Sequence, residues 1–130
     1  AFATALALAL SGCTSLHRHT CDDDQQPFVQ ESLYFGTIQP SGSVTPEEWA
    51  DFLRNIVTPR FPQGLTVWPA SGQWRGADGQ VVREASFVLN ILHENDAASE
   101  QRIREIVAEY KTMFRQEAVL RVRAPACASF

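Results

Sequence analysis

The sequence predicts an α+β domain in which an antiparallel sheet carries two helices on one face. Three observations predict this fold class. Two segments place apolar residues at helical spacing, aromatic and β-branched segments alternate with them along the chain, and an Asp-Gly pair marks a hairpin between two of these segments. Helices and strands that follow one another in this way belong to a single layered domain.

The first predicted strand and the first predicted helix lie between residues 33 and 57. Residues 33–38 are aromatic and β-branched, as in a strand, and residues 40–44 read as a loop. Thr45 is the expected N-cap of the helix, with Pro46 at its first position and Glu48 closing a capping box. Apolar residues then recur at helical spacing, namely Trp49, Phe52, Leu53, Ile56 and Val57.

The second half of the chain repeats the pattern with two more strands, a helix and a last strand. Residues 65–68 predict the second strand, and Asp78-Gly79 predicts a hairpin across which residues 73–75 and 80–82 could pair. Residues 86–93 are apolar on both alternating faces, which indicates a central strand. Residues 94–96 cap a helix with an apolar stripe, made by Ile103, Ile106, Val107, Tyr110 and Phe114. Residues 119–123 alternate apolar and basic residues, as an edge strand does.

The resulting order, βαββαβ, is the ferredoxin-like arrangement. In that topology the first and third strands lie in the middle of the sheet, which agrees with the apolar third strand and the aromatic first strand. Both helices should cover one sheet face. The other face stays open unless a partner, a loop or a ligand covers it.

The N-terminus reads as an export signal followed by a lipid anchor. Residues 1–12 are apolar and small, as in a signal peptide that is truncated upstream, and Leu10-Ser11-Gly12-Cys13 resembles the bacterial lipobox. We expect Cys13 to carry the lipid, residues 13–30 to form a polar tether, and residues 31–130 to form one domain. The alternatives are a plain signal peptide or a short buried helix. Thr14, not Asp, follows the cysteine, which favours the outer membrane if the host has one.

Two cysteines remain after lipidation, Cys21 and Cys127. In an oxidising compartment two cysteines usually pair, so we expect a disulfide that encloses the domain. The alternative is a reactive thiol, which would need a nearby His or Lys. His17 and His19 beside residues 22–24, all aspartate, could bind a divalent metal weakly. A solvated acidic linker explains them better, because a flexible tether fixes no coordination geometry, and we expect no metal.

Composition excludes several classes of function. The net charge is −4 and the eleven basic residues, ten of them arginine, are scattered, which argues against nucleic acid binding. No apolar run reaches the length of a membrane span. The nucleophile-elbow, zinc-protease, dinucleotide and P-loop motifs are absent, so no cofactor is expected.

Four segments resemble an uncharacterised bacterial family, the domain of unknown function numbered 3574. They are Leu33-Tyr34-Phe35-Gly36, residues 58–66 with two prolines and a glycine around Arg60, Gly72-Gln73-Trp74-Arg75, and Arg83-Glu84-x-Ser86. The resemblance covers the chain from Leu33 onward. It implies a secreted or lipid-anchored protein of unknown activity and supplies no catalytic residues.

Five residues are candidates for ligand binding: Arg60, Trp74, Arg75, Glu84 and Tyr34. Arg60 lies in a rigid loop, where it could grip a carboxylate or phosphate or simply pair with a carboxylate such as Glu84. Trp74 and Trp68 could line a pocket, pack on the open sheet face or form a dimer contact.

The sequence supports a catalytic site in the same region less well than a ligand-binding site. Glu84 and His93 could form an acid/base pair, with Tyr34 on a neighbouring strand, although His93 ends its strand and could lie at the surface. We therefore leave enzymatic activity uncertain, with its absence favoured and the catalytic residues unknown.

Three functions remain in competition. The first is a cell-envelope lipoprotein that acts as a binding or interaction module, with the membrane as partner through Cys13 and a homodimer through the open sheet face. The second is a small ferredoxin-like enzyme of the dimeric α+β barrel type, an analogy at the level of fold alone. The third is a small-anion-binding lipoprotein. Both alternatives place a pocket near Arg60, Trp74, Arg75 and Glu84.

Overall fold

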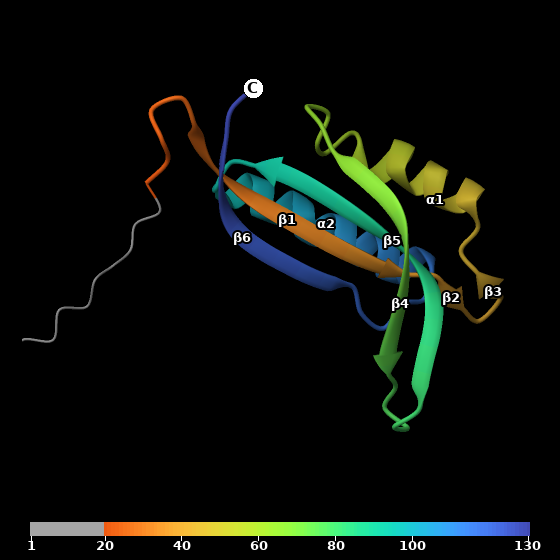
Figure 1. Ribbon diagram of the computed structural model, residues 1–130. Coiled ribbons are helices and arrows are strands. Elements are labelled where there is room, and N and C mark those ends of the chain that lie inside the picture. Colours follow the sequence, from red (N-terminus) through yellow and green to blue (C-terminus); the bar gives the residue numbers. More distant parts are fainter. Residues whose placement is uncertain (1–19) are drawn as a thin grey trace, which may run out of the picture.

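The computed structural model describes residues 20–130, which form one four-stranded antiparallel sheet with helices packed on it (Figure 1). The strand order is β4-β5-β1-β6. The two central strands are therefore the first and third long strands, as the sequence predicts. The bounds of the four strands are β1 Gln26–Gly36, β4 Thr66–Arg75, β5 Val81–His93 and β6 Leu120–Ala128.

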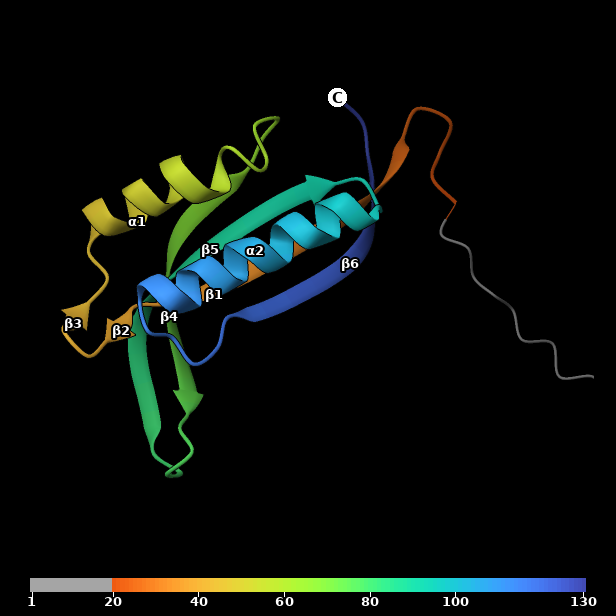
Figure 2. The same cartoon turned by 180° about the vertical axis from the view of Figure 1, so that it is seen from behind.

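Helix α1 (Pro46–Phe52) continues into a short π-helix, η1 (Leu53–Val57), and helix α2 (Ala97–Met113) runs along the sheet (Figure 2). The predicted capping box is present. The Thr45 side chain accepts from the Glu48 backbone N–H, and the Glu48 carboxylate accepts from the Thr45 N–H at 2.8 Å. Asp96 caps α2 by accepting from the Ser99 N–H at 2.7 Å. Both predicted helix starts are confirmed.

Side chains from both helices and from one face of the two central strands make a single core. It is rich in aromatic rings: Phe35 lies with its ring centroid 4.6 Å from that of Tyr110, and Trp49 stacks on Phe87 at 4.5 Å. Such pairs add about 0.5–1.5 kcal/mol each beyond the burial of their area. The buried members of the core are Leu33, Phe35, Val44, Trp49, Phe52, Val57, Phe61, Leu89, Ile91, Ile103, Ile106, Tyr110 and Phe114.

The strands are longer than the sequence patterns indicate. β1 begins at Gln26, so the last five residues of the expected tether belong to the sheet. β4 and β5 each run unbroken into the predicted hairpin, with Trp74 opposite Val82 and Gly79 at a φ of +81° in the turn. The hairpin extends beyond the helix layer (Figure 1). The expected loop before α1 contains a small extra hairpin of β2 (Ile38–Gln39) and β3 (Gly42–Ser43).

A buried ion network joins β6 to the rest of the domain. Glu31 of β1 is fully buried, and its carboxylate receives a bidentate pair of hydrogen bonds from Arg121. The Arg121 guanidinium also donates to Glu100 of α2, at 2.8 and 2.6 Å. Residues 119–123 are predicted to form an edge strand, and β6 lies at the edge of the sheet. The sequence pattern does not predict the role of Arg121, which follows because a buried carboxylate on the neighbouring strand requires a charged partner.

The expected disulfide is present between Cys21 and Cys127, whose Cα atoms are 5.5 Å apart. Cys127 is the β6 partner of Pro27, so the bridge fastens the segment before β1 to the end of β6. Cys13, His17 and His19 lie outside the described residues. No helix in residues 20–130 is long and apolar enough to cross a membrane.

Opening the disulfide should destabilise the domain. In the chain-entropy model a bridge across 106 residues contributes about 4–5 kcal/mol to the free energy of unfolding. We expect Cys21→Ser/Cys127→Ser to lower Tm by roughly 10–25 °C in thermal denaturation, and reduction of the native protein to have the same effect. A titration that finds two reactive thiols in the untreated protein would contradict the bridge.

The Glu100 carboxylate should contribute stability that acid removes. Hydrogen bonds from Arg121 hold its pKa at about 2, below the ordinary 4.5. A lowered folded-state pKa stabilises the domain above about pH 4.5 and is lost as the pH falls toward 2. Glu100→Gln should therefore cost about 1–3 kcal/mol at pH 7 by urea unfolding, and the difference from wild type should shrink between pH 5 and 2. The exposed Glu94→Gln is the control, and an equal effect of both variants would contradict the assignment.

Candidate functional site

The sheet face that the helices leave uncovered, here called the open face, is almost free of charge. Its residues alternate along all four strands with those that face the helices. Of its twenty-two positions, Glu84 is the only charged one. The open face comprises Gln26, Phe28, Gln30, Ser32, Tyr34, Gly36, Thr66, Trp68, Ala70, Gly72, Trp74, Val82, Glu84, Ser86, Val88, Asn90, Leu92, Leu120, Val122, Ala124, Ala126 and Ala128.

A cavity of about 770 Å³ opens on this face. It lies where the end of β1 and the start of β6 meet the hairpin of β4 and β5. The structure brings three sequence-predicted residues together here, Tyr34, Trp74 and Glu84. The remaining lining residues are Gly36, Ile38, Gln39, Pro40, Ala70, Ser71, Gly72, Gln73, Ser86, Arg115, Glu117, Ala118 and Leu120. The size and the mainly apolar walls are typical of small-molecule sites.

The Glu84 carboxylate is fixed at this cavity by three neutral donors. Its Oε2 accepts from the backbone N–H groups of Thr37 at 2.9 Å and Ile38 at 2.8 Å. Its Oε1 accepts from the Trp74 indole Nε1 at 2.9 Å. None of the ion pairs formed by the described residues includes Glu84. The carboxylate is therefore held in one orientation by neutral donors, and it forms no ion pair within residues 20–130.

Gly36 is the residue that gives Glu84 room. A Cβ atom added at Gly36 would lie 2.6 Å from the Glu84 Oε1 atom, closer than any real contact. The Gly36 carbonyl is in turn held by the Tyr110 hydroxyl, which donates to it at 2.7 Å. Burial, and secondarily the nearby Glu84 and Glu48 carboxylates, raise the pKa of Tyr110, so the hydroxyl stays a donor at physiological pH. The core thus positions the floor of the cavity.

The segment after α2 forms one wall of the cavity, through Arg115, Glu117 and Ala118. The sequence patterns do not predict these lining residues. Arg115 takes the left-handed conformation with a φ of +50°, and the Gln116 N–H donates to the Lys111 carbonyl at 3.0 Å. This is the usual way to end a helix, with Arg in a position that commonly holds Gly. The Gln116 side chain then donates to the Ile38 carbonyl at 2.6 Å, which fastens the helix end to β2.

Arg60 and Arg75 do not line this cavity. Arg60 donates to the Glu105 carboxylate at 3.1 Å and to the Ile56 carbonyl at 2.8 Å, so its carboxylate partner is Glu105 and not Glu84. Arg75 follows Trp74 in β4, and successive strand residues point to opposite sheet faces. The expected grouping of Arg60, Trp74, Arg75 and Glu84 is therefore wrong for both arginines.

His93 also lies away from Glu84. It faces the helices from the end of β5, where it is buried, with Nδ1 2.6 Å from the Glu94 carbonyl. Its Nε2 lies 3.6 Å from the buried Glu31 carboxylate and makes no hydrogen bond. The proposed pairing of Glu84 with His93 is excluded because the two side chains are on opposite faces.

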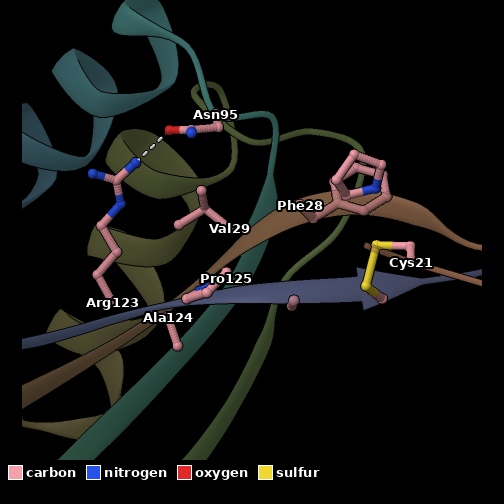
Figure 3. A pocket seen from close by; sticks show the side chains of 10 residues that line it. Cys21, Phe28, Val29, Asn95, Arg123, Ala124 and Pro125 are labelled. Carbon is pink, nitrogen blue, oxygen red and sulfur yellow. Dashed lines mark hydrogen bonds between the residues drawn. A yellow bond between two sulfur atoms is a disulfide. The ribbon is translucent and has the colours of Figure 1, made fainter. Parts of the chain in front are cut away.

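A second cavity, of about 650 Å³, lies beside the disulfide (Figure 3). It is lined by Cys21, Phe28, Val29 and Pro125, with Arg123 held by the Asn95 amide oxygen at 2.6 Å. Arg123 is the only titratable residue among those that line it. Within residues 20–130 no group of three His, Cys, Asp or Glu side chains could hold a metal ion.

Comparison with known proteins gives a family. A model described as a protein of unknown function, DUF3574, matches residues 30–130. The chain belongs to this family. Three of the four segments that carry the family resemblance contribute to the cavity, through Gly36, Trp74 and Glu84. No curated protein matches the chain.

Solved structures share the fold with this DUF3574 protein. A phage SAM lyase in complex with S-methyl-5'-thioadenosine is similar with a TM-score of 0.59 and 15% identity, over 79% of this chain and 90% of that one. The same enzyme in the apo state gives 0.56 and 16%, over 80% and 90%. A periplasmic divalent cation tolerance protein, CutA, from Archaeoglobus fulgidus gives 0.49 and 11%, over 75% and 83%. At these identities the likeness concerns the fold alone, which is of the ferredoxin-like type.

Adding a methyl group at Gly36 should displace Glu84. Gly36→Ala forces the carboxylate away from its three donors, and we expect a cost of about 1–3 kcal/mol in the free energy of unfolding. Gly72→Ala is the matched control, because its Cβ would meet only the Ser86 Oγ atom at an ordinary 3.7 Å. Urea denaturation of both variants measures the difference. Equal stabilities would show that Glu84 is not held as described.

Proposed function

We propose that this DUF3574 protein is a binding module of the bacterial cell envelope, and that the cavity at Tyr34, Trp74 and Glu84 holds a small organic ligand. The observation that carries the proposal is the fixed Glu84 carboxylate in an apolar cavity of about 770 Å³. A few fixed polar groups among apolar walls are what orient a small molecule in its site.

The walls and the charge favour one class of ligand. Tyr34 and Trp74 offer aromatic faces, which bind planar or cationic groups. Glu84 uses three neutral donors and retains lone pairs for a fourth. The best match is therefore a molecule with a planar apolar part and a positively charged or hydrogen-bond-donating group. The two arginines expected to bind a small anion do not serve this cavity, because Arg60 pairs with Glu105 and Arg75 lies on the opposite face.

The fold likeness suggests a first compound to test. The similar phage SAM lyase was solved with S-methyl-5'-thioadenosine, which joins a planar base to an apolar thioether. The likeness supports no activity in this chain. The compound serves as a probe because its shape matches the ligand class that the cavity favours.

The proposal also includes a cellular location and an oligomeric state. Cys13 would carry a lipid that anchors the domain in the envelope, and the Cys21–Cys127 bridge supports an oxidising compartment. The residues from 13 to the start of β1 would then act as the tether. The open face, on which Glu84 is the only charged residue, supports a homodimer, since solvated antiparallel sheet faces are normally polar.

Binding is tested by isothermal titration of the oxidised protein with S-methyl-5'-thioadenosine and with a panel of small planar organic cations. For a compound that binds, Glu84→Gln should weaken the affinity at least tenfold, about 1.4 kcal/mol. Arg60→Ala is the control and should leave Kd within about twofold. A folded wild type that binds nothing in the panel would contradict the proposal, as would equal losses in both variants.

A further inference from the structure

We infer that a second copy of this chain closes the ligand cavity, so that the site is complete only in the dimer. The inference rests on the proposed function for the ligand and on the geometry of the open face for the partner. The Tyr34, Trp74 and Leu120 positions line the cavity and also belong to the open face. Whatever covers that face therefore also covers the cavity.

The open face has the chemistry of an interface between like surfaces. Leu120 is 61% exposed and Val122 47%, while Trp68 is 43% exposed on the opposite edge strand. The only charge on this face, Glu84, is hydrogen-bonded by neutral donors within the domain. Because every other position of the face is uncharged, two copies can meet about a twofold axis without opposing rows of like charges. A twofold axis is the commonest symmetry of soluble oligomers.

The basic residues of β6 point away from this face. Arg121 and Arg123 are opposite Leu33 and Glu31 in the register, on the helix side of the sheet. A strand that kept its arginines on the open face would oppose like charges in a twofold dimer. The placement of Arg121 in the buried ion network thus leaves β6 apolar on the side where a partner would pack.

The open face is large enough for a dimer interface when nearly all of it is covered. Four strands spaced about 4.8 Å apart, with about eleven residues each of roughly 3.3 Å, span roughly 19 by 36 Å, or about 700 Å² in flat projection. Side-chain relief adds accessible area to this projection. Stable interfaces bury about 800 Å² on each partner, so a partner that covered nearly the whole open face would approach this class.

Edge-to-edge pairing is the competing mode of association, and both edges oppose it. β4 carries Pro69 and β6 carries Pro125 within the strand. Proline removes a donor from the exposed ladder, and edge strands use it to block the addition of a further strand. A second copy is therefore expected to pack on the face of the sheet.

The tryptophans provide a direct test that needs no ligand. Trp74 lies in the cavity at 46% exposure, whereas Trp49 is in the core. In Trp68→Phe, fluorescence quenching by acrylamide reports on Trp74. We expect the quenching constant to fall at least twofold as the protein concentration rises from nanomolar to high micromolar, in step with dimer formation measured by sedimentation equilibrium.

Two charged variants distinguish disruption of the interface from the effect of adding an arginine to any exposed position. Val122→Arg places a charge on the open face at a position that does not line the cavity, and it should abolish both the dimer and the change in quenching. Met113→Arg is the matched control, because Met113 is equally exposed, at 48%, on α2. It should behave as wild type.

The outcomes distinguish this inference from the ligand proposal. A chain that stays monomeric at high concentration, or a dimer in which Trp74 remains fully quenchable, overturns the shared site. Neither result depends on any ligand. If a compound binds wild type and Val122→Arg equally, the cavity works alone and only the shared site is wrong. If Val122→Arg loses at least tenfold in affinity and Met113→Arg does not, the site is shared.

Discussion

The arrangement of the site depends on one constraint, the absence of a side chain at Gly36. That absence lets the Glu84 carboxylate reach the backbone N–H groups of Thr37 and Ile38, just past the end of β1. The same carboxylate then fixes the Trp74 indole on the neighbouring hairpin. Because Tyr110 binds the Gly36 carbonyl, this chain of contacts begins in the aromatic core and ends at the cavity wall. Core packing and site geometry are therefore coupled.

The two faces of the sheet hold their carboxylates in different ways. On the helix side, a fully buried Glu31 is neutralised by Arg121, which Glu100 of α2 also holds. On the open face, the single carboxylate is held by neutral donors only. The first arrangement joins a strand to a helix, and the second orients the Glu84 carboxylate at the cavity that we propose to be a ligand site. Both follow from the alternation of side chains along a strand.

Much of the fold could be predicted because its signals are local. The capping box at Thr45, the Asp78-Gly79 turn and the stripe that includes Ile103 and Tyr110 each depend on a few neighbouring residues. The length of β4 and β5 was underestimated, since polar and small residues in both strands are exposed and carry no periodic apolar signal. The ion pair of Arg121 could not be predicted, because its partner Glu31 lies 90 residues away in the sequence.

The candidate site was predicted in part for the same reason. Tyr34, Trp74 and Glu84 stood out by residue type, but only the register shows that Arg75 and His93 point to the other face. The central claim is the fixed Glu84–Trp74 contact. Nuclear magnetic resonance of the indole N–H groups tests it most directly, with Trp74→Phe assigning the signal. We predict that the Trp74 indole proton exchanges with solvent far more slowly than that of Trp68. Exchange as fast as that of Trp68 would contradict the account.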